Sequence, residues 1–238
     1  MLLQFIVVFI VLGGGMFFSV KTGKLTELGA LTGGLLGIAI FIGAGFTGLI
    51  LLGTFFILGT AASAWQVNYK TGLGLAEENK GRRTASQAIA NAGISGLLGI
   101  LSWLYPEKGE LFCLMLAGGF AAATADTLSS ELGNIYGRKY YNILTLKPDK
   151  RGLNGIVSIE GTLIGVLGST LIAFIYGMGI AWGWEVAGII IAGIIGNLTD
   201  SVLGATLERQ RYLSNDAVNF LNTLVGALVA GLFYLLVR

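Results

Sequence analysis

Residues 110–134 read ELFCLMLAGGFAAATADTLSSELGN, and this stretch decides what kind of molecule the chain forms. Its apolar run approaches the roughly 20 residues that a helix needs to cross the hydrocarbon core of a bilayer. Two carboxylates, Asp126 and Glu131, nevertheless stand in its second half. A charged side chain inside a membrane costs on the order of 2.5–3.5 kcal/mol by insertion scales, so each carboxylate indicates a function.

The composition of the whole chain indicates the same membrane class. Of 238 residues, 54% are hydrophobic and only 12% are charged, against roughly 25% charged residues in an ordinary soluble domain. Glycine occurs 38 times, which suits membrane helices whose backbones approach closely. One cysteine excludes an intramolecular disulfide, and the lack of histidine excludes imidazole general-base chemistry and His-ligated zinc.

Hydropathy divides the chain into about eight spans, so we predict an all-α, polytopic membrane helix bundle. The spans are expected at 2–20, 25–42, 45–66, 84–104, 110–134, 154–177, 183–204 and 216–237. A tight turn at Gly43-Ala44-Gly45 must separate the second and third spans, and a seven-span arrangement stays open there. We predict one membrane domain over residues 1–238, with scaffold spans in 1–79 and catalytic spans and loops in 80–238.

The distribution of Lys and Arg predicts the orientation, because cytoplasmic loops carry an excess of these residues. With the N-terminus outside, only Lys108 and Arg238 fall on the outer side. The cytoplasmic side then receives the other 13 of the 15 basic residues, namely Lys21, Lys24, Lys70, Lys80, Arg82, Arg83, Arg138, Lys139, Lys147, Lys150, Arg151, Arg209 and Arg211. We therefore predict a multi-pass protein of the cell membrane with both termini outside.

Five spans carry their polar side chains at this cytoplasmic end. Arg83, Gln87 and Asn91 recur at i, i+4 and i+8 and are expected on one helical face, as are Asp126 and Ser130. At about 1.5 Å per residue, Asp126 lies roughly 15 Å from the inner loop, near the midplane. The remaining members of the group are Glu131, Asn154 and Ser158, Asp200 and Ser201, and Asn215, Asp216 and Asn219.

Five segments of the chain resemble one known family. They are Arg83–Asn91 (RTASQAIAN), Ala125–Gly133 (ADTLSSELG), Asn154–Thr162 (NGIVSIEGT), Asp200–Ala205 (DSVLGA) and Asn215–Phe220 (NDAVNF). In this order they resemble the integral-membrane phytyl-phosphate kinases of vitamin E synthesis, whose prokaryotic relatives have no assigned role. The resemblance implies transfer of a phosphoryl group from a nucleotide, with CTP as the expected donor, to an isoprenyl monophosphate such as phytyl or geranylgeranyl phosphate.

The chemistry of the residues agrees with that activity, since phosphoryl transfer needs mainly positioning and charge neutralisation. Mg²⁺ is the expected cofactor, because it binds one or two carboxylates together with phosphate oxygens. The predicted catalytic metal ligands are Asp126, Glu131, Asp200 and Asp216. The predicted substrate and phosphate contacts are Arg83, Gln87, Asn91, Ser130, Lys147, Lys150, Arg151, Asn154, Ser158, Ser201, Asn215 and Asn219.

Two other functional classes stay open. A CTP-dependent enzyme that makes a CDP-lipid would have a similar metal requirement. An ion-coupled transporter would also bury Asp and Asn near the midplane, but it should carry polar groups in both halves of the membrane. The expected partners are a nucleoside triphosphate, the isoprenyl phosphate and the membrane, with no nucleic acid, and the sequence predicts no oligomeric state.

Overall fold

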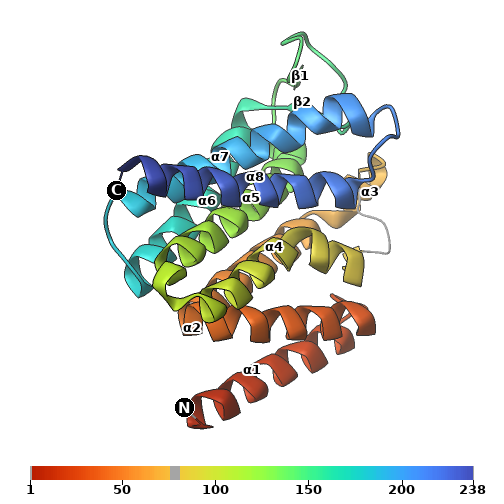
Figure 1. Cartoon of the computed structure of the whole chain (residues 1–238). Coiled ribbons are helices and arrows are strands. Elements are labelled where there is room, and N and C mark those ends of the chain that lie inside the picture. Colours follow the sequence, from red (N-terminus) through yellow and green to blue (C-terminus); the bar gives the residue numbers. More distant parts are fainter. Residues whose placement is uncertain (1, 76–80, 238) are drawn as a thin grey trace.

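Helices make up nearly all of the regular structure in the computed structural model, which describes residues 2–75 and 81–237 (Figure 1). The α-helices are α1 (Leu2–Lys21), α2 (Glu27–Ala64), α3 (Val67–Gly72), α4 (Ala85–Leu104), α5 (Gly109–Tyr136), α6 (Ile159–Gly179), α7 (Trp184–Leu203) and α8 (Asn215–Val237). A 3₁₀ turn, η2 (Pro106–Lys108), precedes α5, and a π-helical turn, η3 (Gly204–Glu208), continues α7. Lys80 and Arg238, which the charge count includes, lie outside the described residues.

The helix α2 is a hairpin of two membrane-crossing halves. At Gly45 the backbone takes φ +60° and ψ −152°, a conformation that favours glycine and interrupts the helix. The halves then lie against each other, since a Cβ at Gly48 would be 2.7 Å from Ile40 Cγ2 and one at Gly37 would be 3.5 Å from Leu52 Cδ2. Within residues 2–75 and 81–237, seven helices are long and apolar enough to span a membrane. Because α2 is a hairpin that crosses twice, these seven helices account for the eight predicted spans.

The helix α5 lies at the centre of the bundle and contacts α2, α4, α6, α7 and α8 (Figure 1). Apart from Phe120, its middle (residues 117–125) consists of small buried residues, and these let neighbouring backbones approach. A Cβ at Gly118 would come 2.7 Å from the backbone oxygen of Gly226 in α8, and one at Gly193 in α7 would come 3.1 Å from Ala121 O. The polar residues of α5 are therefore held in a rigid, close-packed frame.

The helix α1 lies at the edge of the bundle and packs chiefly on α2 (Figure 1). Large apolar side chains such as Phe9 and Phe17 are exposed along it, as expected for a surface that faces lipid. The two chain ends lie on the same side of the bundle in Figure 1, as an even number of crossings requires.

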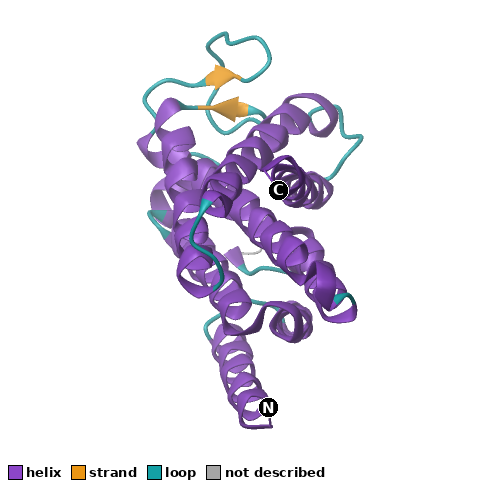
Figure 2. Ribbon diagram, turned by 60° about the vertical axis from the view of Figure 1, so that its left-hand side comes forward, coloured by secondary structure: helices purple, strands orange, loops and turns teal. Residues whose placement is uncertain are grey.

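The loop between α5 and α6 is the main departure from the predicted spans. The sixth helix begins at Ile159 and not at residue 154, because Ile156–Val157 (β2) pairs antiparallel with Tyr141–Asn142 (β1). Ser158 then caps the helix by accepting the N–H of Gly161 at 3.1 Å. Figure 2 shows the two short strands standing outside the helix bundle.

Candidate functional site

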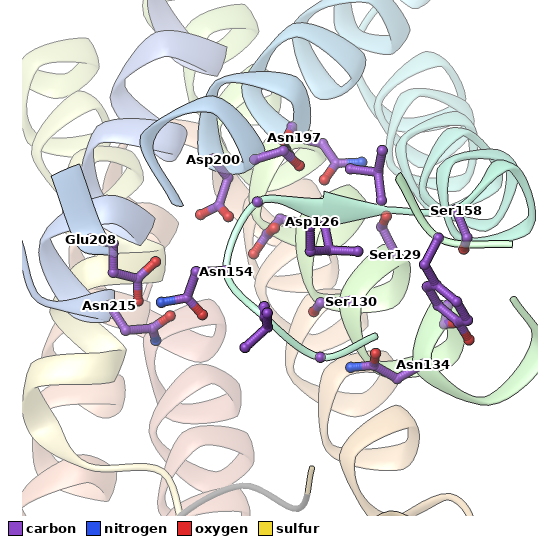
Figure 3. Close-up of a pocket in the computed structure, with 18 residues that line it drawn as sticks. Asp126, Ser129, Ser130, Asn134, Asn154, Ser158, Asn197, Asp200, Glu208 and Asn215 are labelled. Atoms are coloured by element: carbon purple, nitrogen blue, oxygen red, sulfur yellow. Dashed lines mark hydrogen bonds between the residues drawn. The ribbon is translucent and has the colours of Figure 1, made fainter. Parts of the chain in front are cut away.

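A polar cleft of about 210 Å³ opens where α5, α6, α7 and α8 meet the β1–β2 loop (Figure 3). Carboxyl, amide or hydroxyl groups reach the cleft from α5, α7, η3, α8 and the segment between α5 and α6. The polar side chains that line the cleft are Asp126, Ser129, Ser130, Asn134, Tyr140, Asn154, Ser158, Asn197, Asp200, Ser201, Glu208 and Asn215. We call this site the polar cleft.

The carboxyl groups of Asp126 and Asp200 face each other within interaction distance, and Glu208 lies within electrostatic range of both (Figure 3). No salt bridge among residues 2–75 and 81–237 neutralises either Asp126 or Asp200. Two adjacent carboxylates in a poorly solvated site repel each other unless a cation or a proton is shared between them. The pair is therefore suited to bind a divalent cation.

Glycine contacts between helices fix the position of this pair. A Cβ at Gly165 of α6 would come 2.9 Å from both Ala125 O and Asn197 Nδ2, next to Asp126 and one turn from Asp200. Farther along, the Cα of Gly161 would be 2.9 Å from a Cβ at Gly133 of α5. The absence of side chains at these glycines lets α6 approach α5 and brings Ser158 to the cleft.

The loop residues Asn154 and Gly155 are fastened to the end of α7. Gly155 has φ +73°, and its backbone packs so tightly on Ala205 that a Cβ there would lie 2.3 Å from Ala205 N. Arg209 Nε donates to Asn154 O at 2.6 Å, and its guanidinium pairs with Asp149 at 3.4 Å. The backbone N–H of Lys150, followed by Arg209, holds the pKa of the Asp149 carboxyl below its usual value.

A second basic residue, Arg151, lies beside the cleft between two tyrosine rings. Its Cζ is 5.7 Å from the ring centroids of both Tyr69 and Tyr140, and its Nη1 donates to Asn134 O at 3.2 Å. Hydrogen bonds to the Tyr140 and Tyr69 hydroxyls raise the pKa of the guanidinium. Arg151 thus places a fixed positive charge next to two residues that line the polar cleft, Asn134 and Tyr140.

Of the 16 predicted site residues, seven line this cleft and an eighth, Arg151, lies beside it. Those that line it are Asp126, Ser130, Asn154, Ser158, Asp200, Ser201 and Asn215. Lys147 and Lys150 are exposed on the β1–β2 loop. Asp216 and Asn219 lie in the first turns of α8 and do not line the cleft, although their neighbour Asn215 does.

Glu131 is not brought to the polar cleft. Its carboxylate is buried against the ammonium of Lys70 in α3, and Ser63 Oγ donates to it at 2.9 Å. Lys70 Nζ also donates to Ala62 O at 3.0 Å and to Ser63 O at 2.7 Å. The side chain predicted as a metal ligand therefore forms a buried ion pair that ties α2 and α3 to α5.

The polar cleft is also not lined by Arg83, Gln87 or Asn91. Gln87 and Asn91 lie in α4 as predicted, but Arg83 precedes the helix. The helix α4 begins after Thr84, which forms a capping box with Gln87, so Arg83 is extended and bridges to Leu25. The Asn91 side chain donates to Gln87 O at 3.0 Å. Arg83 and Gln87 line a different, apolar cleft between α1, α2 and α4.

Several lining residues were not among the predicted contacts. Asn197 lies one turn before Asp200, so helical spacing was a signal that could have identified it. Glu208 reaches the cleft through the π-helical turn η3, which no pattern in the sequence predicts. Ser129 lies three residues after Asp126 in α5, so the same spacing indicates it, whereas recognition of Asn134 and Tyr140 needed the position of the β1–β2 loop.

The fold and the cleft together define a polytopic membrane protein with a polar, acidic site at one end of its helix bundle. Residues 9–227 match the family described as "Integral membrane protein DUF92", and the chain belongs to this family. This result confirms the family-level resemblance drawn from the five sequence segments. No solved structure matches the chain.

Relatives of the chain include proteins of Arabidopsis thaliana, Synechocystis sp. and Methanocaldococcus jannaschii. The chain is 34% identical to "Protein VTE6, chloroplastic" of Arabidopsis thaliana over 214 residues, which cover 87% of this chain and 64% of that protein, less than two thirds. It is 34% identical to the uncharacterized membrane protein sll0875 of Synechocystis sp. over 82% of this chain and 77% of that protein. It is 35% identical to the uncharacterized membrane protein MJ0933 of Methanocaldococcus jannaschii over 90% of this chain and 87% of that protein.

Proposed function

We propose that the chain is a Mg²⁺-dependent membrane kinase that transfers a phosphoryl group from a nucleoside triphosphate, with CTP as the expected donor, to an isoprenyl monophosphate. The observation that carries this proposal is the Asp126–Asp200 pair in the polar cleft, which no described ion pair neutralises. The relation to Protein VTE6 and the five sequence segments support the isoprenoid substrate class.

The residues of the cleft fit a magnesium ion. Asp126 and Asp200 offer two carboxylates in interaction distance, and Glu208 adds a third negative charge nearby. Mg²⁺ commonly takes one or two protein carboxylates and completes its shell with water and phosphate oxygens. When bound, the ion would supply neutralisation of the charge on the transferred phosphoryl group and its donor.

Binding of the phosphates is assigned to groups around the cleft. Ser130, Asn154 and Ser158 present hydroxyl and amide groups inside it, and Arg151 stands beside it with a guanidinium suited to phosphate oxygens. Lys147 and Lys150 extend the positive charge along the exposed β1–β2 loop. These groups would orient the two phosphates so that the acceptor oxygen is in line with the donor.

The cleft needs no general base for this reaction. The oxygen of the acceptor monophosphate is already ionised near neutral pH, so it attacks the γ-phosphorus of the donor, and the bond from that phosphorus to the β-phosphate oxygen breaks. The products are an isoprenyl diphosphate and a nucleoside diphosphate. The isoprenyl chain stays among the membrane helices while the nucleotide enters from the aqueous side, which we assign to the cytoplasm from the Lys and Arg distribution.

A second reaction deserves the same test because the same cleft and metal would serve it. In a CDP-lipid synthase, the lipid phosphate attacks the α-phosphorus of CTP and pyrophosphate leaves. The two reactions use the same substrates and differ only in which phosphorus is attacked. Their products separate them directly.

The decisive experiment is product analysis with the purified chain, CTP, Mg²⁺ and geranylgeranyl or phytyl phosphate. Formation of the lipid diphosphate and CDP supports the kinase, whereas formation of CDP-lipid and pyrophosphate refutes it in favour of cytidylyl transfer. Asp200→Asn tests the cleft, and Glu160→Gln is the matched control, because Glu160 pairs with Arg138 outside the cleft. If Asp200→Asn and Glu160→Gln lose product formation to the same extent, the loss is not specific to the polar cleft, and this result would argue against the assigned site.

A further inference from the structure

A second cleft, of about 320 Å³, lies between α1, the α2 hairpin and α4 and shares no lining residue with the polar cleft. We call it the apolar cleft. Its volume falls within the range of about 300–1,000 Å³ that small-molecule sites occupy. Apart from Ser19, Arg83 and Gln87, its lining consists of glycines and hydrophobic side chains.

Glycines create the room in this cleft. Gly15 of α1 and Gly33 and Gly53 of α2 all line it, and a Cβ added at any of them would meet no atom within 4 Å. Empty apolar space loses the dispersion contacts that a filled site makes. Because this cleft lies among membrane-spanning helices, the ligand available to occupy it is the hydrocarbon chain of a lipid.

Positive charge is concentrated at one end of the apolar cleft. Arg83 lines it, with its guanidinium 5.2 Å from the ring centroid of Phe55. Two backbone hydrogen bonds fasten the segment of Arg83 to that of Lys24, from Arg83 N to Lys24 O and from Thr26 N to Arg83 O, both at 3.0 Å. We call Lys21, Lys24, Arg82 and Arg83 the basic rim.

The basic rim has a net positive charge. Arg82 Nη2 lies 3.5 Å from Leu25 O, which keeps it next to Lys24 and Arg83. A smaller hollow adjoins the apolar cleft, because Met16 and Ala30 line both. This hollow is also lined by Lys21 and by one carboxylate, Glu27. Among the residues that the structure describes, the three cations Lys21, Lys24 and Arg82 outnumber this one acidic side chain, and this balance favours an anionic group at the membrane surface.

We propose that the apolar cleft binds one acyl chain of an anionic membrane phospholipid, whose phosphate lies against the basic rim. The bound lipid would fill the space that the glycines leave and would join α1 to α4. This site goes beyond the proposed function, and only the exclusion of the isoprenyl acceptor as its occupant rests on that function.

The position of the rim argues against the isoprenyl acceptor as the occupant. The guanidinium of Arg83 contacts Phe55 and Gly59 of α2, whereas the reacting phosphate must reach Asp126 and Asp200 in the polar cleft. The apolar cleft, which Arg83 lines, has no lining residue in common with the polar cleft. A phosphate held at the basic rim is therefore a recognition group and not a reactant.

The test is native mass spectrometry of the full chain in detergent, titrated with phosphatidylglycerol and with phosphatidylcholine of the same acyl chains. The wild type should bind phosphatidylglycerol more tightly. Replacing Lys21, Lys24 and Arg82 by Gln should weaken that binding by about fivefold for each cation removed and leave phosphatidylcholine unchanged. Equal affinity for the two lipids in the wild type would overturn the proposal.

Space-filling variants test the cleft itself. Gly33→Leu should lower the fraction of lipid-bound protein at least fivefold. If Gly33→Leu does not fold, Gly53→Leu places a side chain in the same cleft from the other half of the α2 hairpin. Gly14→Leu is the matched control, because Gly14 also has open space around it but does not line the cleft. If all three variants bind lipid equally, the lipid lies elsewhere and the proposal fails.

A further comparison separates this proposal from the kinase. Asp126→Asn should still bind phosphatidylglycerol at the wild-type affinity, because Asp126 lines only the polar cleft. Lipid binding is measured without nucleotide, so a negative result in the kinase assay does not affect the test of phospholipid binding. Recovery of an isoprenyl monophosphate as the tightly bound lipid, lost in Gly33→Leu, would overturn the assignment of a phospholipid.

Discussion

The two carboxylates in the second half of α5 have opposite surroundings. Asp126 faces Asp200 across the polar cleft, and none of the described ion pairs includes it. Glu131, five residues later, is buried against Lys70 and Ser63. A carboxylate inside a membrane protein is therefore available to a ligand only where the protein provides no cation of its own, and the two positions should respond differently to loss of charge.

The largest effect on activity is expected at the Asp126–Asp200 pair. Asp126→Asn and Asp200→Asn should each lower kcat by at least about a thousandfold, since an amide oxygen replaces a carboxylate in the assigned magnesium site. Removing one of two adjacent like charges relieves repulsion, so the melting temperature should stay the same or rise. Near-normal turnover in both variants, measured by product formation, would show that the pair is structural.

The largest effect on stability is expected at Glu131. Glu131→Gln leaves the buried Lys70 ammonium without its carboxylate, which should lower the free energy of unfolding by about 3–5 kcal/mol. Thermal unfolding in detergent measures the change. The double variant Glu131→Gln/Lys70→Met removes both charges and should recover a large part of the loss. A stable, inactive single variant would instead place Glu131 in the chemistry.

The sequence predicted the spans well because a membrane helix satisfies its own backbone and must be about as long as the bilayer is thick. The turn at Gly45 was predictable from adjacent glycines, and the structure confirms it. Asp126 and Asp200 were predictable because a charge in the membrane is costly enough to indicate function, and the structure places both in one cleft.

The parts that sequence reasoning missed depend on contacts between distant residues. The partner of Glu131 is Lys70, which is 61 positions away in a helix of six residues with no periodic pattern of its own. Arg83 lies outside its expected helical face because Thr84 caps α4 one residue later. Glu208 reaches the polar cleft through a π-helical turn, a geometry that residue spacing does not indicate.

A smaller effect is expected at Arg151, beside the cleft. Arg151→Lys keeps the charge but loses the planar group that lies between Tyr69 and Tyr140 and bonds Asn134 O. We expect KM for one phosphate substrate to rise about tenfold with kcat changed less than threefold. Steady-state kinetics with each substrate varied in turn would identify the phosphate concerned. An unchanged KM for both substrates would remove Arg151 from the site.

The smallest effect is expected at Asp216, the fourth carboxylate predicted from the sequence. It lies in the first turn of α8 and does not line the polar cleft, while Asn215 beside it does. Its negative charge at a helix N-terminus is favourable by about 0.3–1 kcal/mol, so Asp216→Asn should lower stability only slightly. If the metal is held by Asp126 and Asp200, this variant should keep kcat within about threefold of the wild type, a barrier change below about 1 kcal/mol. A loss as large as that in Asp200→Asn would show that α8 moves Asp216 into the cleft when substrates bind, and the magnesium site would then include a third carboxylate.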